Sequence, residues 1–136
     1  MDTTPKYILM SEKAVEIQDG WTPERGDRMV VIKDGEILET LRYLSEEEAD
    51  AAYLCLVKRK KLKERVSIVF IPRQDQLQGM VGQPYSTQAK QLRELACFDD
   101  DNTFRTYEQL WMAFLYDRKY NKCWSEDKQD WEVICN

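Results

Sequence analysis

Three consecutive aspartates are the residues of this sequence whose types and spacing come nearest to a catalytic group. Asp99, Asp100 and Asp101 precede Asn102, and Mg²⁺ and Ca²⁺ prefer such oxygen ligands. One hypothesis is therefore an enzyme in which these carboxylates, or that of Asp75, hold a divalent metal ion. The segment lacks the alternating ligands, central glycine and distal glutamate of a calcium loop. We therefore favour a turn that places negative charge ahead of the next helix, and we predict no metal site and no cofactor.

The absence of histidine restricts the chemistry more than any other count. Without histidine, the chain has no Ser-His-Asp or Cys-His nucleophile system and no histidine ligand for a catalytic zinc. Its five glycines form no phosphate-binding loop. We identify no catalytic residue and favour a noncatalytic protein, with the metal enzyme as the alternative.

A basic stretch is the candidate binding surface in this sequence. Its residues are Lys58, Arg59, Lys60, Lys61, Lys63 and Arg65. They end a predicted helix that begins with four acidic residues within 46–50, and the helix dipole favours this polarity. The alternative is that the stretch binds nucleic acid or an acidic partner. Because the net charge of −5 opposes general affinity for phosphate, a protein partner is the favoured hypothesis and nucleic acid the second.

The length and composition are those of an ordinary globular protein. At 136 residues, 43% apolar and 33% charged, we expect one domain over residues 1–136. No apolar run approaches the roughly 20 residues that span a bilayer, and no secretory signal is evident. The four cysteines contain no Cys-x-x-Cys pair, so reduced thiols and a cytoplasmic location, away from membranes, are the expectation. The oligomeric state is not predicted.

Local patterns predict the elements of the N-terminal half. A helix over 3–19 begins at Thr3 or Thr4, and its apolar stripe consists of Tyr7, Met10, Ala14, Ile17 and Trp21. Strands are predicted at 28–33, 36–42 and 66–71, the first two joined by an Asp34-Gly35 turn. A helix over 46–63 begins at Ser45, and its buried stripe consists of Ala49, Ala52, Tyr53, Leu56 and Val57.

An aromatic helix and hairpin dominate the C-terminal half. Short helices are predicted at 73–81 and 87–97, and a longer helix begins at Thr106 with Gln109 as its capping partner. Its apolar face comprises Tyr107, Leu110, Trp111, Phe114 and Leu115, widened by Met112, Ala113 and Tyr116. Two short strands that carry Trp124 and Trp131 then form a hairpin. The aromatic cluster is interpreted as core, with an exposed partner-binding patch as the alternative.

These elements predict an α+β protein. A small, mainly antiparallel sheet packs on helices, and the helical C-terminal half is closed by the tryptophan hairpin.

Three segments together resemble a family of small proteins encoded by phages and prophages of Gram-positive bacteria. They are residues 6–27, with Ala14 to Gln18 followed by Trp21-Thr22-Pro23; residues 71–81, with Pro72 to Gln78; and residues 107–131, with Glu108 to Trp111 and the hairpin. Residues 36–66 carry none of this resemblance, and the turn after Trp124 is longer than the family's Trp-Asn-Gly-Glu turn. The family has no assigned activity, so the resemblance implies a phage-associated, cytoplasmic setting and no mechanism. We therefore expect a noncatalytic, phage-associated accessory protein that binds another protein.

Overall fold

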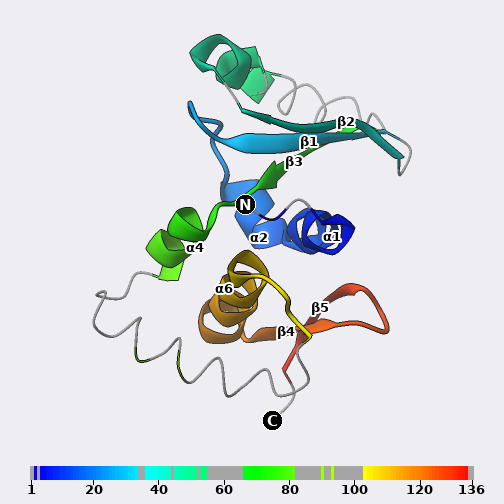
Figure 1. Ribbon diagram of the computed structural model, residues 1–136, viewed down its shortest axis with the longest axis vertical. Coiled ribbons are helices and arrows are strands. Elements are labelled where there is room, and N and C mark those ends of the chain that lie inside the picture. The colour runs from blue at the N-terminus through cyan, green and yellow to red at the C-terminus, as the bar shows by residue number, and fades with distance from the viewer. Residues whose placement is uncertain are drawn as a thin grey trace. The chain divides into compact units, whose positions relative to one another are not determined.

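The computed structural model describes residues 2, 4–33, 36–43, 45–51, 53–54, 66–81, 90, 93 and 103–134 (Figure 1). The chain forms two compact units: one comprises Met1–Met10 and Arg73–Asn136, and the other comprises Ser11–Pro72. The expectation of one domain stays a prediction. Helices accompany a three-stranded antiparallel sheet and a two-stranded hairpin, so the predicted α+β class is confirmed.

The unit at Ser11–Pro72 is built around the three-stranded sheet. Strands β1 (Arg28–Lys33), β2 (Glu36–Tyr43) and β3 (Val66–Ile71) have the order β2-β1-β3, and both pairings are antiparallel. The predicted strands at 28–33, 36–42 and 66–71 are therefore confirmed. The predicted turn at Asp34-Gly35 lies outside the described residues. Figure 1 shows a helix beside β2, which comprises residues 46–51 and 53–54, and helix α2 (Val15–Gly20) close to β3.

One apolar cluster of this unit lies between one face of the sheet and the helix at 46–54, and Val30, Val69 and Ile71 on the opposite face are also buried. Met29 of β1 and Ala49 of the helix are buried together, and Trp21, Val31 and Ile68 pack against them. Alternate residues of a strand share a face, which explains why Met29 and Val31 meet the helix. The predicted packing of the sheet on a helix is therefore confirmed.

The predicted helix over 3–19 is wrong in one respect, because two helices occupy this span. Helix α1 (Pro5–Lys13) is separated from α2 by Ala14, whose φ of −80° and ψ of 69° are not helical. The amide of Ala14 donates to the carbonyl of Ser11 at 3.2 Å, and that carbonyl also accepts the Gln18 side-chain amide at 2.9 Å. These bonds satisfy a carbonyl that the end of α1 would otherwise leave unpaired. The predicted cap at Thr4 is present, since its hydroxyl accepts the Tyr7 amide at 3.3 Å.

The other unit contains the aromatic helix and the hairpin. Its elements are α4 (Gln74–Val81), α6 (Tyr107–Leu115), the π-helical segment η1 (Tyr116–Tyr120), and strands β4 (Lys122–Ser125) and β5 (Asp130–Val133), together with the first residues of α1. The hydroxyl of Thr106 accepts the Gln109 amide at 3.2 Å, so the predicted start of α6 is confirmed. Asn121 ends the helical run with a positive φ of 53°, a conformation that asparagine tolerates.

The tryptophan hairpin is confirmed, and its aromatic residues are core. Trp124 and Trp131 are direct partners across β4 and β5, with ring centroids 5.2 Å apart. The Ile134 amide donates to the Asn121 carbonyl, so the two tryptophans form a non-hydrogen-bonded pair, the arrangement in which opposite side chains approach most closely. Trp131 also stacks on Tyr116 at 4.2 Å.

Burial along α6 is wider than a single stripe. All six consecutive residues from Trp111 to Tyr116 are buried, as the widened apolar face predicts. Tyr107 is 62% exposed, so its assignment to that face is wrong. It is the first residue of the helix, one turn before the buried Trp111.

Candidate functional site

The exposed face of the helix at 46–54 is the surface on which apolar and charged side chains meet. The helix begins at Ser45, whose hydroxyl accepts the Glu48 amide at 3.2 Å, and the Ala49 amide donates to the Ser45 carbonyl. Among its described residues, Ala49 alone is buried, and Glu48 is half-buried. The remaining described residues of this helix face solvent.

Two large apolar side chains end the described part of this helix. Tyr53 is 51% exposed and Leu54 is 62% exposed, so the prediction that Tyr53 belongs to the buried stripe is wrong. The helix meets the sheet through Ala49, and Tyr53 lies one turn further along the helix. Ala52, Leu56 and Val57, the other predicted members of the stripe, lie outside the residues whose side chains are described.

Acidic side chains adjoin this apolar pair. Asp50 lies three residues before Tyr53 and four before Leu54, so it is one helical turn from both. Glu46 and Glu47 lie one turn further back on the same face, and all three acidic residues are exposed. The surface therefore combines an apolar end with three carboxylates along roughly two turns of helix.

Most of the sequence-predicted site residues lie outside the described part of the chain. This applies to the basic stretch Lys58, Arg59, Lys60, Lys61, Lys63 and Arg65, and to the cluster Asp99, Asp100, Asp101 and Asn102. Asp75 is described: it lies on α4, is exposed, and pairs with Arg73 at 3.1 Å. No group of three or more potential ligand side chains is arranged to hold a metal ion in the described ranges.

The buried carboxylate of Asp2 joins the starts of two helices. One oxygen accepts the Thr4 amide at 2.8 Å, and the other accepts the Thr106 hydroxyl at 2.6 Å and the Gln109 side-chain amide at 2.7 Å. Burial by itself raises the pKa of Asp2, but the hydrogen bonds from Thr106, Thr4 and Gln109 outweigh it and lower the pKa below its ordinary value. The positive ends of α1 and α6 also favour the charged form. Asp2 therefore has a structural role, because it links the start of α1 to the start of α6.

The buried carboxylate of Asp27 organises the loop between α2 and β1. It accepts the indole N–H of Trp21 at 2.9 Å and the Glu24 amide at 3.0 Å. Trp21 in turn stacks on Phe70 of β3, with centroids 5.0 Å apart and planes inclined by 4°. Gly26 has a φ of 89°, which glycine adopts without strain. The Asp27 carboxylate, like that of Asp2, therefore has a structural role.

Polar residues of the segments that carry the phage-family resemblance also bind the backbone. Gln18 pairs with Phe70 of β3 in both directions, at 2.8 and 2.9 Å. Gln76 accepts the Arg73 amide at the start of α4, and Gln109 accepts the Arg105 amide before α6. The indole of Trp131 donates to the Met10 carbonyl at 3.1 Å. The contacts of Gln76 and Gln109 are local, whereas the partners of Gln18 and Trp131 lie 52 and 121 residues away and have no local signal.

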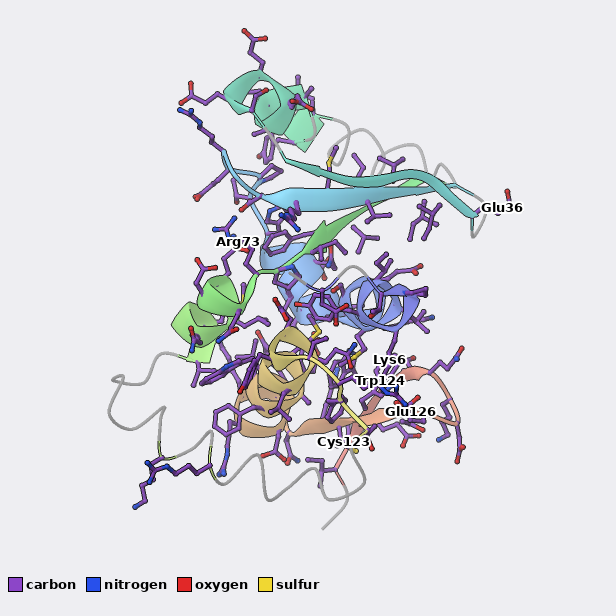
Figure 2. The ribbon with its side chains drawn as sticks, in the orientation of Figure 1. Lys6, Glu36, Arg73, Cys123, Trp124 and Glu126 are labelled. Atoms are coloured by element: carbon purple, nitrogen blue, oxygen red, sulfur yellow. The ribbon has the colours of Figure 1, made fainter. Side chains whose placement is uncertain are left out.

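Lys6 holds the hairpin in the unit that contains β4 and β5. It pairs with Glu126 in the hairpin turn, donates to the Thr103 carbonyl, and lies 5.3 Å from the centre of the Phe104 ring. Figure 2 labels Lys6 and Glu126, which lie side by side. These contacts join segments about 100 residues apart, and they leave Lys6 engaged in three interactions.

Comparisons of the chain with protein-family models, curated proteins and solved structures found no match. Within the described residues, no helix has both the length and the apolar character needed to cross a bilayer.

Proposed function

We propose that this protein is a noncatalytic, phage-associated accessory protein that binds another protein through the exposed face of the helix at 46–54. The observation that carries the proposal is the adjacent exposure of Tyr53 and Leu54, at 51% and 62%. Single exposed apolar residues are ordinary, but here two large ones lie next to each other at the end of the described helix, and exposed apolar helix residues can bind a groove of a partner. Tyrosine is also among the residues that contribute most to protein interfaces.

The use of the buried polar groups supports a noncatalytic role. The carboxylates of Asp2 and Asp27 accept hydrogen bonds from neighbouring helices and loops. A catalytic carboxylate must present an oxygen to substrate or to metal, whereas these oxygens are directed at the protein itself. The phage-associated setting rests on the sequence resemblance.

The test is quantitative capture of lysate proteins, treated with nuclease, by the tagged chain. The double variant Tyr53→Ala and Leu54→Ala removes the apolar pair while keeping a good helix former at both positions. Tyr107→Ala and Val15→Ala form the matched control, because these residues are 62% and 53% exposed and lie elsewhere. We expect the first variant to lose a specific partner at least about tenfold, which corresponds to about 1.4 kcal/mol of binding energy, while the control retains it.

Two results would reject this proposal. Equal capture by both double variants would exclude the helix as the binding surface. Loss of all capture after nuclease treatment would favour the alternative of nucleic-acid binding, for which the basic stretch at 58–65 is the candidate.

A further inference from the structure

We propose that the partner of this helix presents a cationic surface around an apolar pocket. The inference rests on the proposed function and deepens it, because it specifies the chemistry of the partner. The pocket would receive Leu54 and the ring of Tyr53, and the surrounding cations would face Asp50, Glu46 and Glu47.

The positions of the carboxylates carry this inference. Acidic residues in the first turn of a helix are explained by the helix dipole, and Glu46 and Glu47 lie there. Asp50 lies beyond the first turn and one turn from both apolar residues, where the dipole effect has fallen off. Its carboxylate is exposed beside the two side chains that a partner would cover. Positive charge close to Asp50 is the best match for a partner that buries them, because hydrogen bonds from a cation to a carboxylate are stronger than those from a neutral donor.

The cost of desolvating the carboxylates disfavours an apolar or acidic partner surface at this position. Desolvating a carboxylate without a compensating charge or hydrogen bond is strongly unfavourable, and a like charge opposite it costs further free energy. Cations at the rim would remove this penalty and would also accelerate encounter through electrostatic steering. The apolar pair supplies contact area, and the three acidic residues determine which partner surface is compatible.

The binding experiment uses host proteins that a cation-exchange resin retains at neutral pH, since these present cationic surfaces. The full-length protein is compared with two triple variants. Glu46→Gln, Glu47→Gln and Asp50→Asn neutralise the proposed site. Asp19→Asn, Glu24→Gln and Glu36→Gln remove three exposed charges elsewhere in the same unit, so both variants have the same net charge.

We expect capture from this fraction to fall about tenfold between about 0.05 M and 0.5 M salt, because screening shortens the reach of charge interactions. At low salt the site variant should lose binding at least about fivefold, and the control variant should lose less than about twofold. Circular dichroism must show the same helix content in all three proteins, and if either triple variant unfolds, the single variants Asp50→Asn (site) and Asp19→Asn (control) are compared instead.

The outcomes separate this inference from the proposed function. Capture that depends on Tyr53 and Leu54 but is unaffected by salt and by the site variant would overturn the cationic partner and leave the binding helix in place. Equal losses in the site and control variants would show an effect of net charge alone, and would also overturn the inference. Capture that does not depend on Tyr53 and Leu54 would reject both.

Discussion

Replacing each tryptophan of the hairpin by phenylalanine tests whether the Trp131 indole joins β5 to helix α1. Trp124 and Trp131 are opposite each other in one strand pair and have nearly equal exposure, 9% and 8%. The Trp131 indole N–H donates to the Met10 carbonyl at 3.1 Å, whereas that of Trp124 is buried without a partner in the described structure. Phenylalanine removes the same atoms from both positions.

The hydrogen bond distinguishes the two substitutions. Met10 is fully buried, and the Ala14 amide, which would bind its carbonyl in an unbroken helix, donates to Ser11 instead. Trp131→Phe therefore leaves a buried carbonyl unpaired, at a cost of about 2 kcal/mol. Trp124→Phe removes a donor that is already unpaired, so its only cost in stability is the cavity left by the smaller ring. We expect Trp131→Phe to lower the free energy of unfolding by about 2 kcal/mol more than Trp124→Phe.

The assay is urea denaturation followed by far-ultraviolet circular dichroism, because tryptophan fluorescence changes with the substitutions themselves. Both variants and the parent protein must give the same denaturant slope for the free energies to be compared. Equal destabilisation, or a larger loss for Trp124→Phe, would refute the assigned role of the Trp131 indole.

Three further predictions concern stability. Asp2→Asn should lower the free energy of unfolding by about 2 kcal/mol at pH 7, while the exposed control Asp19→Asn should change it by less than about 0.5 kcal/mol. Folding lowers the pKa of Asp2 below 3.8, so its contribution to stability is present above that pH and is lost as pH falls through the folded pKa. If the melting temperatures of Asp2→Asn and the parent protein differed equally at pH 7 and at pH 2, this reasoning would be contradicted. Gln18→Ala should destabilise the protein by about 2 kcal/mol and speed hydrogen exchange of the Phe70 amide in β3 that Gln18 binds. Unchanged exchange at this amide would argue against a stabilising role of the Gln18–Phe70 hydrogen bonds. Gly79→Ala, in a helix with open space around the new Cβ, should stabilise by about 0.7 kcal/mol, whereas Gly26→Ala, at a φ of 89°, should destabilise by about 1 kcal/mol; thermal denaturation that ranks them in the opposite order would reject the assigned backbone conformations.

Short-range patterns predicted those elements whose signals lie within a few residues. The short apolar runs within 28–33 and 66–71 predicted β1 and β3, and the capping residues Ser45 and Thr106 predicted where two helices begin. The two tryptophans spaced around a polar turn predicted the closing hairpin. In each case the predictive signal lies within a few consecutive residues, so no knowledge of the remaining protein was needed.

The candidate site was only partly predictable. Helical periodicity states which side chains share a face, but not which face meets the sheet. The sequence therefore assigned Tyr53 to the core together with Ala49, although Ala49 is buried with Met29 while Tyr53 is 51% exposed. The acidic residues at 46–50 were recognised, but as partners of the helix dipole alone.

By itself, the sequence determined the α+β fold class, the strands, the cap of α6 and the aromatic character of the C-terminal half. Tertiary structure decided what joins distant segments: Gln18 binds Phe70, 52 residues away, and Trp131 binds Met10, 121 residues away. At the interruption at Ala14, the Met10 carbonyl accepts the Trp131 indole and the Ser11 carbonyl accepts the Gln18 side-chain amide, so neither carbonyl is left unpaired. Such contacts depend on three-dimensional proximity, which local periodicity and capping do not encode.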